Sequence, residues 1–149
     1  MSGDVRVERV INAPRAEVFR AWTDPDELRR WWGPGEYATH YAEVDLRPGG
    51  DYLLVIQGVE GDEMHLAGTF HEVAAPERLV YSWRWVRGWS DPAESLVTVE
   101  FEDLGERTRI VLVHAALEDS PDPNGYRLGW ESGLGKLAAT VERSPHAGG

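Results

Sequence analysis

Residues 124–143, NGYRLGWESGLGKLAATVER, carry the longest helical pattern of this chain and indicate how the remainder folds. Apolar residues recur along this segment at helical spacing and define one stripe. The stripe consists of Tyr126, Trp130, Leu134, Leu137 and Val141. A helix with a single apolar side needs a second layer that covers that side, and the preceding sequence supplies it.

Three glycines lie in the interior of this helical segment, at positions 129, 133 and 135. Each costs about 1 kcal/mol relative to alanine in a helix interior. Glycines in such a place indicate either close approach to another backbone or space left open beside the helix.

Six short strand patterns precede the helix and follow one another across tight turns. They span residues 39–46, 51–59, 64–73, 78–89, 95–103 and 108–115. Short strands in succession with short turns are typical of an antiparallel meander.

The chain begins with a strand pattern and two short helical patterns. Residues 5–11, VRVERVI, alternate as a strand does, and residues 12–22 read as a helix with Pro14 near its first turn. Asp24 can cap the next helix, since Pro25 suits the first helical position and Glu27 completes a capping box.

The second helical pattern ends in a pair of tryptophans beside a chain breaker. Leu28, Trp31 and Trp32 are spaced i, i+3 and i+4, which places them on one helix face, and Gly33-Pro34 then stops the helix. The whole order of elements predicts the α+β class. We expect a curved antiparallel sheet around the terminal helix, closed at one end by the short helices, with Trp31 and Trp32 at the rim of the enclosed space.

Length and composition indicate one ordinary globular domain. The 149 residues contain no cysteine, which excludes a disulfide framework and a thiolate nucleophile. No apolar run approaches the roughly 18 residues of a membrane span, and the first residues lack the apolar core of a signal peptide. We predict a single cytoplasmic domain over residues 1–149, ordered over about 4–143, with a flexible C-terminal tail.

The net charge of −11 opposes binding to phosphate backbones and to anionic membranes. The sequence also fails the spacing rules for phosphate-binding loops, zinc-protease helices, nucleophile elbows and EF-hand loops. We therefore predict no nucleic-acid partner, no membrane insertion, no metal and no cofactor, and we assign no catalytic residue.

Aromatic residues are concentrated on the face that the sheet turns toward the helix. Strand alternation places Leu79, Tyr81, Trp83 and Trp85 on one face, and Ile110, Leu112 and His114 share a face in the last strand. Leu79, Tyr81, Ile110 and Leu112 fit a plain core, whereas Trp83, Trp85 and Trp130 suit a core or a pocket wall. His114 is either a satisfied buried histidine or a catalytic base.

Five stretches, in this order, resemble one bacterial family. They are INAPRAEVFRAWTDPDELRRWWGP (11–34), EVDLRPGGDYLLVIQG (43–58), GTFHEVAAPERLVYSW (68–83), VTVEFEDLGERTRIVLVH (97–114) and LGWESGLGKLA (128–138). The family is named for the activator of the heat-shock-90 ATPase and belongs to the START-like, helix-grip superfamily. The resemblance implies a seven-stranded antiparallel sheet that grips the C-terminal helix, with a cavity between them.

The resemblance does not select one function, because this superfamily includes carriers, cyclases and co-chaperone domains. Our leading hypothesis is a module that binds a small hydrophobic molecule, lipid-like or aromatic, between sheet and helix. The predicted ligand-binding residues are Trp31, Trp32, Tyr81, Trp83, Trp85, His114, Tyr126 and Trp130. A cyclase or hydrolase that uses His114, and a co-chaperone-type domain with a chaperone partner, stay open as alternatives, as does a homodimer.

Overall fold

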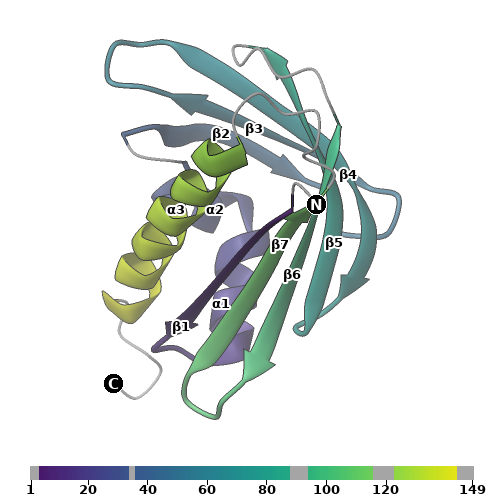
Figure 1. Cartoon of the computed structure of the whole chain (residues 1–149), viewed down its shortest axis with the longest axis vertical. Helices are drawn as coiled ribbons and strands as arrows, with labels where there is room; N and C mark the ends of the chain where they lie inside the picture. The colour runs from purple at the N-terminus through teal and green to yellow at the C-terminus, as the bar shows by residue number, and fades with distance from the viewer. Residues whose placement is uncertain (1–3, 34–35, 88–93, 116–122, 144–149) are drawn as a thin grey trace.

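Seven antiparallel strands form one curved sheet in the order β1-β7-β6-β5-β4-β3-β2, and the helices lie inside its curve (Figure 1). The computed structural model describes residues 4–33, 36–87, 94–115 and 123–143. Strands β2 to β7 pair in chain order, each with its neighbour in sequence. Strand β1 lies at the other edge of the sheet and pairs with β7. The predicted α+β class, with a curved sheet around a C-terminal helix, is confirmed.

The elements match the sequence patterns closely, with small differences at their ends. They are β1 (Val5–Ile11), α1 (Arg15–Thr23), α2 (Pro25–Trp31), β2 (Ala38–Val44), β3 (Asp51–Gln57), β4 (Glu63–Ala74), β5 (Arg78–Arg87), β6 (Ser95–Asp103), β7 (Thr108–Ala115) and α3 (Pro123–Arg143). The predicted tail and part of the predicted turn at residues 90–94 lie outside the described residues.

The junction between α1 and α2 is set by Asp24. Its side chain accepts hydrogen bonds from the backbone N–H groups of Asp26 (2.8 Å) and Glu27, and Pro25 occupies the first turn, as predicted. The helix ends differ slightly from the sequence patterns. Helix α1 begins at Arg15, three residues after the predicted start, and Pro14 is its N-cap next to the first turn, with an extended backbone (ψ 151°). Trp32 is extended too and follows α2 as its C-cap, so the turn of helix ends at Trp31.

A glycine allows β4 and β5 to approach each other closely where the sheet bends. A Cβ atom on Gly68 would lie 2.0 Å from the backbone oxygen of Ser82 and 2.6 Å from the ring of Tyr52. That same Ser82 oxygen accepts a hydrogen bond from the Tyr52 hydroxyl at 2.7 Å. The close approach of β4 to β5 therefore depends on the absence of a side chain at residue 68.

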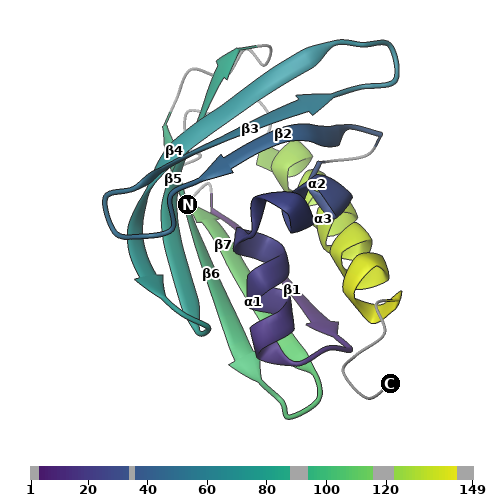
Figure 2. The ribbon, with the colours of Figure 1, turned by 180° about the vertical axis from the view of Figure 1, so that it is seen from behind.

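Helix α3 crosses the concave side of the sheet and shares the core with α1 and α2 (Figure 2). Its predicted stripe faces inward, since Trp130, Leu134, Leu137 and Val141 are all buried and Tyr126 is half-buried. The core continues into α1 through edge-to-face rings, with Phe19 and Phe101 at 5.2 Å between centroids. The N-terminal part of α3 is left facing an open space rather than more core.

The cap at Asp24 can be tested by substitution. Asp24→Ala removes the acceptor for two backbone N–H groups, so we expect the free energy of unfolding to fall by about 1 kcal/mol. Denaturant titration measures this change. Asp26→Ala, at an exposed position of the same turn, is the control and should change stability by less than about 0.5 kcal/mol. Equal effects of the two substitutions would contradict the capping role.

Candidate functional site

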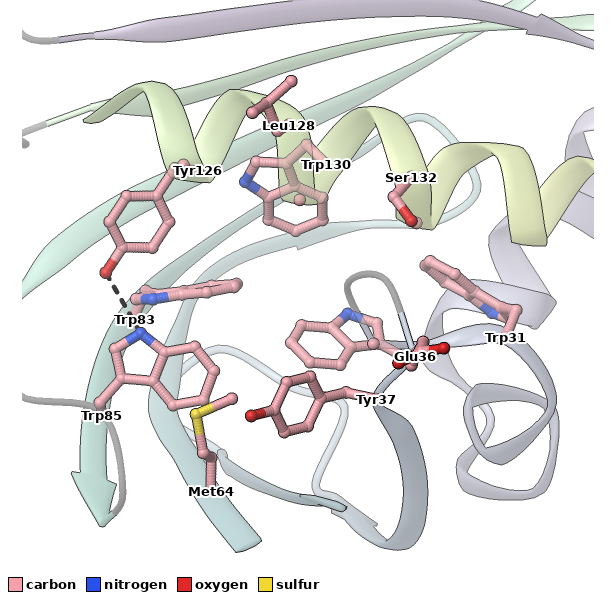
Figure 3. Close-up of a pocket in the computed structure, with 15 residues that line it drawn as sticks. Trp31, Glu36, Tyr37, Met64, Trp83, Trp85, Tyr126, Leu128, Trp130 and Ser132 are labelled. Carbon is pink, nitrogen blue, oxygen red and sulfur yellow. Dashed lines mark hydrogen bonds between the residues drawn. The ribbon is translucent and has the colours of Figure 1, made fainter. Parts of the chain in front are cut away.

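A cavity of about 450 Å³ lies between the N-terminal half of α3, strands β4 and β5, and the segment that follows α2 (Figure 3). Its described lining is Trp31, Trp32, Gly33, Glu36, Tyr37, Met64, Trp83, Trp85, Gly125, Tyr126, Leu128, Gly129, Trp130, Ser132 and Gly133. Five of the seven tryptophans of the chain belong to this lining. Aromatic rings therefore form most of the wall.

The tryptophans touch one another and form a continuous surface. Ring centroids lie 5.3 Å apart for Trp83 and Trp130, and 5.7 Å apart for Trp32 and Trp83. Two pairs meet almost at right angles, Trp32 with Trp130 (88°) and Trp83 with Trp85 (88°). Perpendicular rings make corners, so the wall presents ring faces in several directions.

Trp31 and Trp32 are wall residues rather than rim residues, which corrects the sequence expectation. Only 2% of Trp31 and 5% of Trp32 is exposed. Trp31 is also anchored in the core, because its indole N–H donates to the Ala21 carbonyl at 2.8 Å and its ring contacts Trp22. Pro34 and Gly35, which completed the predicted breaker, lie outside the described residues. The exposed lining residues are Leu128 and Glu36.

At the end of the cavity formed by β5 and the start of α3, Trp85 and Tyr126 are joined directly. The Trp85 indole N–H donates to the Tyr126 hydroxyl at 3.1 Å, as the dashed line in Figure 3 shows. Because the two residues come from different elements, this bond ties helix to sheet beside the cavity. Trp83 lies between them and Trp130, and its own indole N–H is buried without a hydrogen-bond partner among the described residues.

His114 supports the wall from behind and does not line the cavity. The Trp130 indole N–H donates to His114 Nδ1 at 3.0 Å, and an indole nitrogen can only donate. Nδ1 therefore carries the lone pair, and the ring proton sits on Nε2, which donates to Ser95 Oγ at 2.7 Å. His114 is 0% exposed, so its neutral ring holds Trp130 in place from inside the core.

Tyr81 also lies outside this lining, although alternation along β5 placed it on the same face. It borders a second space of only about 20 Å³, near Trp22 and Phe70. Its hydroxyl accepts a hydrogen bond from the Trp22 indole N–H at 3.3 Å. Burial raises the pKa of Tyr81 well above its ordinary value, since a buried phenolate would lack solvation. Tyr81 is thus a neutral core residue.

Lys136 fastens α3 to the wall segment that carries Gly33 and Tyr37. Its ammonium group donates to the Gly33 carbonyl at 2.6 Å and to the Tyr37 carbonyl at 2.9 Å. Partial burial lowers the pKa of Lys136, because leaving water disfavours its charged form. These two bonds hold both ends of the short segment between α2 and β2 against the helix.

The remaining polar groups of the lining are few. The Tyr37 hydroxyl donates to the Asp62 carboxylate, and this bond raises the pKa of Tyr37 above its ordinary value. Ser132 contributes a hydroxyl from α3, and Glu36 is the one charged side chain among the described lining residues. The lining is thus mostly apolar with a few polar groups, as is typical of cavities that bind small molecules.

Of the eight residues predicted to bind a ligand, the structure brings six together around the cavity and leaves Tyr81 and His114 in the core. Sequence reasoning did not include Glu36, Tyr37, Met64, Leu128 and Ser132. The glycine signal in α3 did point here, because Gly129 and Gly133 both line the space. A Cβ atom on Gly133 would meet only Trp31, at 3.9 Å, and one on Gly135 would meet nothing within 4 Å.

No described helix is long and apolar enough to cross a membrane. Within the same residues, no group of three or more His, Cys, Asp or Glu side chains is arranged to hold a metal ion.

The curved sheet, the gripped C-terminal helix and the two short helices define the class as a START-like, helix-grip domain. Residues 12–142 match the family model described as activator of Hsp90 ATPase homolog 1-like protein. The chain therefore belongs to this family, as the resemblance implied.

Solved structures from several bacteria share the fold over nearly the whole chain. A crystal structure from Chromobacterium violaceum is 29% identical with a TM-score of 0.87, covering 95% of this chain and 99% of that one. The AHSA1 protein from Silicibacter pomeroyi is 29% identical with a TM-score of 0.81, covering 93% and 97%. CalU16 from Micromonospora echinospora is 26% identical with a TM-score of 0.71, covering 94% and 76%. No curated protein matches the sequence significantly.

The supporting role of His114 makes a prediction about stability. His114→Leu leaves the Trp130 N–H without its acceptor, so we expect unfolding free energy to fall by about 1–3 kcal/mol. Trp130→Phe removes the donor, and His114→Leu should cost clearly less in that background. A double-mutant cycle from denaturant titrations measures this coupling. Independent, additive effects of the two substitutions would contradict the assigned bond.

Proposed function

We propose that this protein binds a small hydrophobic molecule, aromatic or lipid-like, in the cavity between β4, β5 and α3. The observation that carries the proposal is the aromatic wall itself, which encloses about 450 Å³. Cavities that bind small molecules typically measure about 300–1,000 Å³ and are mostly apolar with a few polar groups.

The cavity lowers the stability of the protein, and this cost in free energy supports a binding role. Glycines at 129 and 133 weaken α3 by about 1 kcal/mol each relative to alanine, and both face the cavity. The buried N–H of Trp83, unpartnered among the described residues, is a further cost in the same wall. Larger residues at these glycines would fill the space and strengthen the core, so the open volume is consistent with a ligand.

The enzyme hypothesis receives less support from the described residues. A general base must reach its substrate, whereas His114 is fully buried and both of its ring nitrogens are engaged. Among the described lining residues, Glu36, Ser132, Tyr37 and Tyr126 carry groups capable of acid-base or nucleophilic chemistry.

The protein-interaction hypothesis would be favoured by one large apolar patch on the surface. The exposed large apolar residues of the described chain are instead spread over several elements. They are Val10, Tyr41, Leu46, Val59, Val86 and Leu128. Scattered apolar residues are ordinary on a protein surface.

A side chain introduced into the cavity should weaken the binding of a ligand there. Gly133→Leu projects a side chain into the space beside Trp31, so we expect affinity for the neutral dye N-phenyl-1-naphthylamine to fall at least about ten-fold. Fluorescence titration measures the affinity, and thermal melts check that the variant is folded.

Gly135→Leu is the matched control, because residue 135 is in the same helix but outside the described cavity lining. This variant should bind the dye as the parent protein does. If the parent protein fails to bind the dye, or if both leucine variants bind it equally well, the cavity is not the binding site.

A further inference from the structure

The charge and shape of the cavity wall narrow the class of ligand, provided that the proposed function holds. Described side chains give this wall one charged group, the carboxylate of Glu36, and no ammonium or guanidinium group. Lys136 lies close by, but its ammonium group is directed to the Gly33 and Tyr37 carbonyls and is not part of the lining. A carboxylate or phosphate on the ligand would thus find no cationic partner among these residues.

Seven tryptophan and tyrosine rings of the described residues line the cavity, and the face of such a ring is the negative part of its quadrupole. Trp22 stacks on Trp130, at 6.0 Å between centroids and 17°, and Trp130 belongs to the lining of the cavity. Figure 3 shows Trp85 and Tyr37 across the same space from Trp130. A cation is attracted to such faces when it lies within about 6 Å of the ring centroid.

Two ring pairs of the wall are nearly perpendicular, Trp32 with Trp130 and Trp83 with Trp85. Rings that differ in direction in this way suit contacts with a compact group from more than one side. Aliphatic side chains, which suit a fatty-acyl chain, are represented in the described lining by Met64 and Leu128 only.

We infer that the cavity binds an alkylammonium cation, of the trimethylammonium type, attached to an apolar or aromatic body. The tryptophan faces contact the cationic group, and Glu36 at the exposed edge attracts it. A trimethylammonium group is weakly hydrated, so its transfer from water into an aromatic cavity costs less free energy than the transfer of a primary ammonium group. The net charge of −11 raises the local concentration of any such cation near the protein.

The test compares three probes of similar size that differ in charge, by displacement of N-phenyl-1-naphthylamine. They are phenyltrimethylammonium, its neutral isostere tert-butylbenzene, and the anion benzenesulfonate. We expect phenyltrimethylammonium to displace the dye at a concentration at least about ten-fold lower than tert-butylbenzene does, with benzenesulfonate weakest. Equal or tighter binding of the neutral isostere would overturn the inference and leave the proposed function standing. Absence of binding by the dye and by all three probes would overturn both.

Three variants at two positions assign the effect to named groups. Trp85→Leu should remove most of the preference for the cation, while Trp85→Phe, which keeps a ring face, should retain part of it. Glu36→Gln should weaken phenyltrimethylammonium binding about two- to five-fold, less so with added salt, and leave tert-butylbenzene unaffected. Since Trp85 is buried, melts establish folding first, and the comparison of probes on the parent protein decides the matter if Trp85→Leu unfolds.

The same cationic group occurs in free molecules and in phosphatidylcholine headgroups, and vesicles distinguish the two sources. Phosphatidylcholine vesicles that displace the dye and float with the protein assign a lipid headgroup. Displacement by soluble phenyltrimethylammonium alone assigns a free small molecule. A dye that neither source displaces contradicts the inference.

Discussion

The hydrogen bond from the Trp130 indole to His114 is the contact on which the cavity depends. It joins the middle of α3 to β7, and the histidine continues the chain of bonds to Ser95 on β6. Helix and sheet are therefore held at a fixed separation by groups that are costly to leave unpaired in a dry interior. The bond to His114 and the stacking on Trp22 fix the side-chain conformation of Trp130, so its ring cannot rotate into the cavity and fill it.

Around that fixed point, the wall is assembled from segments far apart in sequence. Lys136 reaches Gly33, which lies 103 residues earlier, and Trp85 reaches Tyr126, 41 residues later. Each bond connects α3 to a different side of the cavity. The space is thus bordered by rigid elements and by a short segment that is fastened to α3 through the carbonyls of Gly33 and Tyr37, an arrangement that limits how far the wall can relax into the space.

The sequence predicted the fold well because periodicity is a local signal. Alternation along residues 78–87 correctly turned Trp83 and Trp85 inward, and helical spacing gave the buried stripe of α3. The candidate site was predicted less completely, since alternation gives the face of a strand but not the depth of a residue. Tyr81 and His114 share the inward face with the wall residues and yet lie in the core. Glu36, Tyr37 and Lys136 had no periodic signal at all, because their contacts exist only after distant segments have met.

The pairing of β1 with β7 has a consequence for the synthesis of the protein on the ribosome. Val5 pairs with His114 and Ile11 with Thr108, so β1, the first strand synthesised, can pair only after β7, the last strand, has been synthesised. Until then its backbone N–H and C=O groups have no partner strand, although β2 to β6 can already form their consecutive pairs. Such a distant closure slows folding and leaves an unpaired strand exposed on the nascent chain. Because His114 lies in that same strand and Trp130 in the helix that follows it, the bond that supports the cavity forms only after the edge of the sheet can close.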